Sequence, residues 1–268
     1  MRAVLLLLLA LPLAMSAQPV PASDLSAEDK AWCEDGDAMR RGVREACEVR
    51  AVRLDARDEI EVDGGTNGGI RVQGWDRDEI LVVTRVRAYS EERSTAYKLL
   101  EEVTISTDGT IEAEVPRTRG DDWVGSSFRI YVPRDTDLDL ESSNGGIRIT
   151  AVSSTIRFDT SNGGVRLVDL GGDVRGRTGN GALRIELGGQ SWDGEGLDVT
   201  SGNGTVKLYI PDNYSGRFAS GTGNGRLNVD FPITVQGRID KNVEFTLGEG
   251  GPLLRARTGN GSVRIERS

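Results

Sequence analysis

The sequence predicts an all-β chain, a repeat-built single-stranded β-helix or β-solenoid with one short helix inserted and a disulfide-stapled N-terminal cap. The composition supports this class, because the 268 residues include 35 glycines and only 5% aromatics, which is typical of strands and turns. An Asn-Gly dipeptide opens the same alternating strand seven times along the chain. Its asparagines are Asn67, Asn144, Asn162, Asn180, Asn203, Asn224 and Asn260.

The residues that follow the asparagine have the same pattern in every copy of the repeat. The third and fifth residues are apolar, as in Ile70 and Val72, and the fourth is a cation in six of the seven copies. Because successive side chains of a strand point to opposite faces, each copy places two apolar side chains toward a core and one residue outward. These outward residues are Arg71, Arg148, Arg166, Arg184, Lys207, Asn228 and Arg264.

The spacing of the copies indicates how they assemble. Asn144, Asn162 and Asn180 follow one another at intervals of 18 residues, and each short interval contains a second strand, so a short repeat has about two to three strands with turns. A single unit of this size does not bury its apolar face alone, whereas stacked copies form a continuous core. We therefore expect one coil per copy, with the asparagine amides stacked as a ladder and each Asn-Gly corner in the positive-φ region. The alternative is a twisted β-sandwich of stacked hairpins, since Asn-Gly is also a strong hairpin signal.

Residues 1–22 have the pattern of a secretory signal peptide. One cation, Arg2, precedes a short apolar run and a stretch of small residues, and cleavage is expected between residues 16 and 22. The run is too short to span a membrane, and no later stretch is apolar enough. The sequence therefore predicts an exported protein, periplasmic or extracellular, that does not span the membrane.

Residues 23–48 are polar and predict an N-terminal cap segment. Asp24 or Ser26 is placed to cap a short helix at residues 27–33. Cys33 and Cys47 are the only cysteines, and in an oxidising compartment we expect them to form a disulfide. Its closed loop is worth roughly 3 kcal/mol in the chain-entropy model. The alternative is a redox or metal pair, which the lack of histidine and of C-x-x-C spacing disfavours.

Residues 49–268 form the predicted repeat domain. Strands are expected near residues 49–54 and 60–62, a strand with a tight turn and a return at 71–79, and a buried strand at 80–86. The helical spacing of Ala96, Leu99 and Leu100 predicts the inserted helix within residues 90–103, with Ser90 as its N-cap. Strands resume at 104–106, 111–115 and 128–132, repeats crowd together from residue 137, and residues 231–254 are an insertion.

The charge balance and the lack of histidine exclude several function classes. The formal net charge is −9, and an acidic chain repels the phosphates of nucleic acid. With no histidine, Ser-His and Cys-His catalysis and histidine metal sites are removed. No metal or cofactor is predicted, since the glycine-rich turns also lack the aspartate-bearing nonapeptide of calcium-binding β-rolls.

Three stretches of the repeat resemble a known family. Residues 133–140 (PRDTDLDL), 143–149 (SNGGIRI) and 258–265 (TGNGSVRI) are similar to the bacterial putative-adhesin β-strand-repeat family, a domain of unknown function. The resemblance extends over about residues 49–268 and implies an exported, β-helical, repeat-built domain. It implies no reaction, because the family has no established catalytic residues.

The outward cations are the candidate binding site. If copies stack in register at about 4.8 Å, Arg148, Arg166, Arg184 and Lys207 form a column, with Arg71 and Arg264 near its ends. Such a column is either a solvated face or a platform for an anionic glycan or an envelope protein. We expect an exported, non-enzymatic, adhesin-like scaffold that binds through this elongated face. The acids considered as its counter-charges are Asp159, Glu186, Asp198 and Asp230.

An enzyme is the alternative function. A long β-helix is able to present paired carboxylates in a groove, as a carbohydrate-active enzyme requires. Their adjacent or alternate spacing is common in acidic loops and defines no geometry, so the surface interpretation is preferred. The candidate pairs are Asp121/Asp122, Asp137/Asp139 and Asp193/Glu195.

Overall fold

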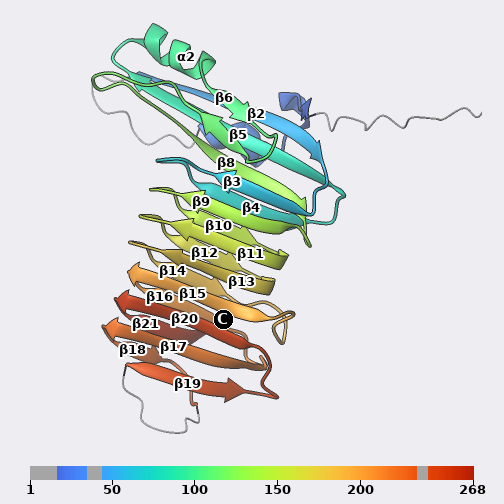
Figure 1. Cartoon of the computed structure of the whole chain (residues 1–268), viewed down its shortest axis with the longest axis vertical. Coiled ribbons are helices and arrows are strands. Elements are labelled where there is room, and N and C mark those ends of the chain that lie inside the picture. The colour runs from blue at the N-terminus through green and yellow to red at the C-terminus, as the bar shows by residue number, and fades with distance from the viewer. Residues whose placement is uncertain (1–16, 35–43, 234–240) are drawn as a thin grey trace, which may run out of the picture.

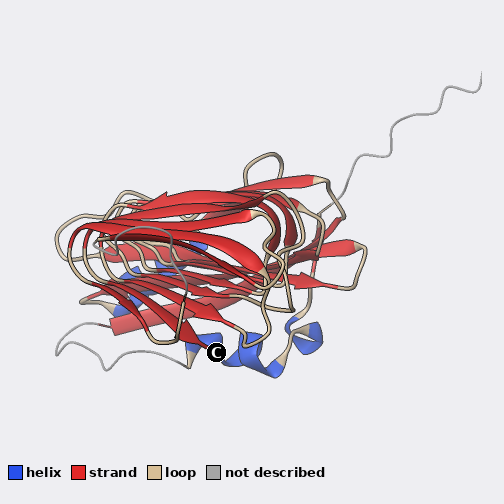
Figure 2. Cartoon of the chain, turned by 90° about the horizontal axis from the view of Figure 1, so that it is seen from below, coloured by secondary structure: helices blue, strands red, loops and turns tan. Residues whose placement is uncertain are grey.

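The chain forms two large sheets that lie over one another, as predicted for an all-β protein. The computed structural model describes residues 17–34, 44–233 and 241–268, so most of the predicted signal peptide, part of the cap segment and part of the 231–254 insertion lie outside the described residues. Seen along the stack, the strands form two layers (Figure 2). No helix in these three ranges is long and apolar enough to cross a membrane.

The larger sheet has 11 strands and the smaller has eight (Figure 1). In spatial order the large sheet contains β1 (Gln18–Pro19), β2 (Arg44–Asp55), β5 (Glu79–Ser90), β8 (Trp123–Pro133), β4 (Ile70–Trp75), β10 (Ile147–Thr150), β12 (Val165–Val168), β14 (Leu183–Glu186), β16 (Val206–Ile210), β21 (Val263–Arg267) and β18 (Leu227–Val229). The small sheet contains β19 (Asn242–Leu247), β17 (Gly216–Asn224), β20 (Leu253–Asn260), β15 (Gly196–Asn203), β13 (Gly171–Thr178), β11 (Ser153–Thr160), β9 (Asp137–Ser142) and β3 (Glu59–Asp63). The remaining elements are the pair β6 (Thr104–Ser106) and β7 (Glu112–Glu114), the helices α1 (Ala27–Lys30) and α2 (Arg93–Glu101), and the 3-10 turns at Ala22–Asp24 and Ala31–Cys33.

Each repeat is one strand of the small sheet, an Asn-Gly turn, and one strand of the large sheet. Equivalent strands of neighbouring repeats pair in parallel, so that Ile147 lies opposite Val165 and Val165 opposite Leu183. These side chains are buried between the sheets in a single continuous core. Stacked hairpins would instead pair the two strands around each turn, whereas here those two strands lie in different sheets.

The turns stack through a ladder of asparagine amides. Each Nδ2 donates to the Oδ1 of the next asparagine, at 3.3 Å for the Asn144 to Asn67 bond and 2.8 Å for the other five bonds. A second ladder of hydrogen bonds lies beside it. Its donor is the buried hydroxyl of the residue two positions before an asparagine. Its acceptor is the carbonyl of the glycine that follows the asparagine of the neighbouring repeat. Thr160 donates in this way to Gly145 at 3.0 Å, and Thr178 to Gly163 at 2.7 Å.

The predicted positive-φ corner is found at one of the seven turns, where Gly261 has a φ of 152°. The other six turns have no positive φ at the asparagine or at the glycine that follows it, since the only described non-glycine residues with positive φ are Ala151 and Asp169. The glycine after asparagine is required by close approach instead. A Cβ on Gly163 would overlap the carbonyl oxygen of Gly145, the equivalent glycine of the neighbouring repeat, and the same holds at Gly181 against Gly163.

The order of the strands departs from the order of the chain in two places. Residues 71–79 make the expected strand, turn and return, but the returning strand β5 does not pair with β4, because β8 lies between them, parallel to β4 and antiparallel to β5. The reason is that Phe128 and Ile130 flank a cation as Ile70 and Val72 do, so β8 fits beside β4 without an Asn-Gly turn of its own. The second departure is at the other end, where β20 and β21 lie inside the stack rather than at its edge.

The N-terminal end of the stack is covered by α2 and the cap segment. Helix α2 packs Ala96, Leu99 and Leu100 against β2 and β5. The predicted N-cap is wrong: Glu92 holds that position, and the Ser90 hydroxyl accepts only from the Glu92 backbone N–H, at 3.3 Å. In the cap segment Ser26 is the N-cap of α1, as one of the two predicted alternatives. The predicted Cys33–Cys47 disulfide is confirmed.

The close approach of the turns yields a test with neighbouring glycines. We expect Gly163→Ala to lower the free energy of unfolding by about 1–3 kcal/mol, because the new Cβ displaces a carbonyl in a packed turn. Gly164→Ala is the control, since its Cβ would lie 3.7 Å from the nearest backbone oxygen, an ordinary contact. Urea unfolding followed by far-UV circular dichroism measures both. Equal effects of the two substitutions would contradict close stacking as the reason for the glycine.

Candidate functional site: the cationic column of the large sheet

The register of the large sheet places one cation per strand in a continuous line across its outer face. In spatial order this cationic column comprises Arg129, Arg71, Arg148, Arg166, Arg184, Lys207 and Arg264. Asn228 follows opposite Arg264 and ends the line. The sequence analysis missed Arg129, because no Asn-Gly precedes β8. The apolar-Arg-apolar pattern of residues 128–130 was the signal that would have found it.

The small sheet distributes its charges differently. Its corresponding outward line contains Glu61, Asp139, Arg157, Arg175, Asp198 and Arg255 in register, so that charges of both signs share the line. Arg255 pairs with Asp198 at 2.8 Å, and Arg175 with Asp173 at 3.1 Å. Because like charges on adjacent strands are unfavourable, the cationic column is an electrostatic exception within the same fold.

The middle of the column is partly neutralised by Glu186. Its Oε1 accepts from Arg166 at 2.8 Å and from Arg184 at 2.6 Å. Burial raises the pKa of Glu186, but the hydrogen bond from Arg184 and the charges of both arginines outweigh this, so its pKa is held below the usual value. Arg184 also stacks on the Tyr209 ring at 4.3 Å.

The other acids considered as counter-charges lie elsewhere. Asp159 and Asp198 belong to the small sheet, where they pair with Arg177 and Arg255. Asp230 follows β18 at the far end of the stack. Glu186 is therefore the one of the four predicted acids that the structure brings against the column.

Arg71 and Arg148 lie in the N-terminal half of the column, between Arg129 and Arg166. Neither has an acidic side chain within ion-pair distance among the residues that the structure describes, and the same holds for Lys207 and Arg264. Burial lowers the pKa of Arg148, and the neighbouring charges of Arg166 and Arg71 lower it further. These two arginines are therefore less neutralised than Arg129, Arg166 and Arg184.

The cap segment contacts Arg129, the first cation of the column. Asp29 is buried and accepts from Nη1 of Arg129, only 5% exposed, at 3.0 Å. The Tyr131 hydroxyl lies 3.2 Å from the same carboxylate, and burial together with the charge of Asp29 raises the pKa of Tyr131 to about 12. The Trp32 ring lies 4.1 Å from the Arg129 guanidinium carbon, so the segment binds the column through a carboxylate and an aromatic ring.

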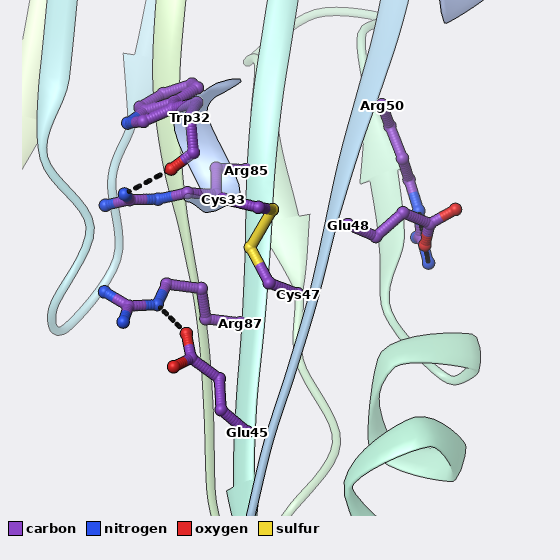
Figure 3. Close-up of a disulfide and its surroundings, with 8 residues drawn as sticks. All are labelled: Trp32, Cys33, Glu45, Cys47, Glu48, Arg50, Arg85 and Arg87. Carbon is purple, nitrogen blue, oxygen red and sulfur yellow. Dashed lines mark hydrogen bonds and ion pairs between the residues drawn. A yellow bond between two sulfur atoms is a disulfide. The ribbon is translucent and has the colours of Figure 1, made fainter. Parts of the chain in front are cut away.

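The disulfide fixes this segment to the edge of the large sheet. Figure 3 shows Cys33 bonded to Cys47 of β2, with the Trp32 carbonyl accepting from Arg85 of β5 at 3.0 Å. Arg85 also lies 4.9 Å from the Trp32 ring. Trp32 is thereby held between Arg85 and Arg129, beside the start of the free part of the column.

Two hollows open where the cap segment meets the column. One has a volume of about 250 Å³ and is lined by Glu28, Gln73, Arg129, Tyr131, Thr150 and the two free arginines, Arg71 and Arg148. The other has a volume of about 320 Å³ and lies along Trp32, Arg85, Arg166 and the same two arginines. Arg71 and Arg148 thus line both hollows, with a side chain from the cap segment at each.

The three candidate carboxylate pairs lie in three separate parts of the fold. Asp121 and Asp122 lie in the turn before β8, Asp137 and Asp139 on β9, and Asp193 and Glu195 in the connection from β14 to β15. The Asp137 carboxylate accepts from the Thr155 backbone N–H at 2.8 Å, which is a structural contact between rungs. Within the described ranges, no group of three Asp, Glu or Cys side chains is arranged to hold a metal ion.

Comparison with known proteins finds similar folds among solved structures. No protein-family model matches the chain, and no curated protein matches it. A putative cell adhesion protein from Clostridium sporogenes is 12% identical, with a TM-score of 0.40 over 84% of this chain and 100% of that chain. A putative lipid binding protein from Parabacteroides distasonis is 11% identical (TM-score 0.34; 82% and 96% covered). A putative adhesin from Bacteroides fragilis is 12% identical (TM-score 0.31; 82% and 97% covered).

Proposed function

We propose that this chain is an exported, non-enzymatic interaction protein that binds an acidic glycan of the cell envelope through the cationic column. The observation behind the proposal is the unneutralised pair Arg71 and Arg148, on adjacent strands and in register with Arg166. Parallel strands are about 4.8 Å apart, so the guanidinium groups form a regular row. Planar guanidinium groups match carboxylate and sulfate oxygens in bidentate geometry.

The scaffold in this proposal is a β-solenoid with two strands per coil. Its support is the alternation of the chain between the two sheets, the parallel register and the two ladders at the turns. We divide the chain into a signal peptide at residues 1–22, a cap segment at 23–48 and a repeat domain at 49–268. In such a solenoid the column is a straight, elongated binding face, which suits a polymer with repeated charges better than a small molecule.

The cap segment supports a carboxylate as the recognised group. Asp29 is a carboxylate that the chain itself supplies to the first cation of the column, Arg129. Its neighbour Trp32 places a ring against the same guanidinium. The next two cations, Arg71 and Arg148, have open hollows in place of such a partner. A uronic acid or a sulfated sugar offers the same combination of an anionic group on a ring.

A merely solvating role explains the column less well. Surface charge on both sheets would serve solubility, and the small sheet achieves it with charges of both signs, as Asp198 beside Arg255. The large sheet instead keeps an unbroken line of seven cations, at an energetic cost that a bound polyanion removes. The protein as a whole has a formal net charge of −9, so attraction of an anion has to be local to this face and weakened by salt.

Removal of the free arginines tests the proposal. We expect R71A/R148A to weaken binding of uronic-acid or sulfated oligosaccharides at least tenfold, which corresponds to about 1.4 kcal/mol. The measurement is a glycan array followed by calorimetric titration of the best ligand. R157A/R175A is the matched control, with the same charge change at adjacent positions of the small sheet, and it should stay within about twofold because its site is not the column. Unchanged binding by R71A/R148A would overturn the proposal, as would an equal loss in the control.

The neutralised middle of the column yields a test in the opposite direction. We expect E186Q to strengthen binding of the same ligand about twofold to fivefold, because it frees Arg166 and Arg184 from an ion pair of about 0.5–1 kcal/mol. D198N is the control, since it removes an acid from the small sheet by the same chemical change. Titration of both variants at one salt concentration measures the effect. Unchanged or weaker binding by E186Q would contradict contact between the ligand and these two arginines.

A further inference from the structure

The last repeat of the chain occupies a place that its position in the sequence does not explain. The repeats β9/β10 through β15/β16 are added to the stack in chain order, and β17/β18 comes next in the chain. Yet β20 lies between β15 and β17, and β21 lies between β16 and β18 (Figure 1). The final repeat is therefore inserted between two earlier ones.

We call the space between β15/β16 and β17/β18 the slot. The inserted repeat pairs in an equivalent register with both sides of this slot. Thr258 of the inserted repeat lies opposite Ser201 on one side and Thr222 on the other. Val263 likewise lies opposite Val206 and opposite Leu227. Because both walls match the same residues, β17/β18 would also pair in register with β15/β16 directly. The slot exists only because an equivalent repeat fills it.

The inserted repeat is held by the contacts that join every other repeat. Asn260 donates to Asn203 at 2.8 Å and accepts from Asn224 at 2.8 Å. The Thr258 hydroxyl donates to the Gly204 carbonyl at 2.8 Å, as Thr178 does to Gly163 elsewhere. The same repeat from a second copy of the chain would make all of these contacts without change.

The connection into the inserted repeat is short and rich in glycine. Residues 248–252 lead from β19 to β20, and Gly248 and Gly250 have φ angles of 54° and 81°. These glycines give the turn its left-handed conformation and also allow it to extend at little steric cost. A short connection whose two ends are both paired in a sheet is the usual hinge of strand exchange.

We propose that β20 and β21 exchange between two copies of this chain, so that each copy fills the slot of the other. The exchanged dimer has the same strand pairs, amide ladder and core contacts as the monomer and differs only at residues 248–252. Exchange of identical elements is a low-cost route to a dimer, and the dimer is favoured as protein concentration rises. The partner is therefore a second copy, and the interacting surface is the pair of sheet edges on β15/β16 and β17/β18.

Single cysteines on one side of the slot and on the repeat that fills it test the exchange. Asp198 of β15 and Arg255 of β20 lie opposite one another. We mix full-length D198C and R255C, refold them together at low and high concentration, and add a short bismaleimide. A crosslink between the two variants forms only when β20 of one copy lies beside β15 of the other. We expect the ratio of this dimer to monomer to rise in proportion to protein concentration, with the joined peptides identified by mass spectrometry.

The controls separate exchange from random contact. The R157C and R175C variants lie opposite one another on β11 and β13, which are consecutive in the chain and should not crosslink between copies. The D198C/R255C double variant should crosslink within a monomer, which establishes that the reagent spans the pair. The mass of the unmodified protein after the same refolding is measured by light scattering. Monomer alone at every concentration would overturn the proposal, as would equal crosslinking of the control pair.

Discussion

The stacking of the Asn-Gly turns is the constraint on which the rest of this structure depends. A Cβ on Gly163 would overlap the backbone of its neighbour, so the turns fit only when glycine follows asparagine. The asparagine amides and the buried hydroxyls then join each turn to the next through one fixed set of hydrogen bonds. Because both ladders allow a single register, every residue at a given distance from its asparagine is aligned with its equivalents. The parallel sheets and the buried apolar pairs follow from that alignment.

Because the repeats are aligned, charged residues at one equivalent position form a line of charge across the sheet. On the small sheet the aligned positions carry charges of both signs, and Asp198 and Arg255 neutralise one another. On the large sheet they are cationic, and three acids relieve the line locally: Glu28 and Asp29 at Arg129, and Glu186 at Arg166 and Arg184. The stretch between Arg129 and Arg166 is where an external anion would gain most, and it is also where the cap segment leaves two hollows.

The periodic features of this molecule were predictable from sequence, and the non-periodic ones were not. The all-β class, the disulfide and the existence of an inserted helix follow from pattern and composition. The places of β8 and β20 do not, because the repeat pattern is shared by the copies and does not specify the order in which they stack. Docking of Asp29 and Trp32 against Arg129 leaves no periodic signal either. The expectation of a positive-φ corner failed at six of the seven turns because the dipeptide was interpreted in isolation, whereas neighbouring turns lie in close contact.

The most direct measurement is a crystal structure of the protein with an oligosaccharide of uronic acids. Electron density for the sugar along the outer face of the large sheet, with its carboxylates within hydrogen-bond distance of Arg71 and Arg148, is the expected result. The Cys33–Cys47 disulfide should remain intact, so that Trp32 stays at the edge of the occupied hollow. Sugar bound instead to the small sheet, or to the acidic hollow around Asp55 and Asp137, would contradict recognition by the cationic column.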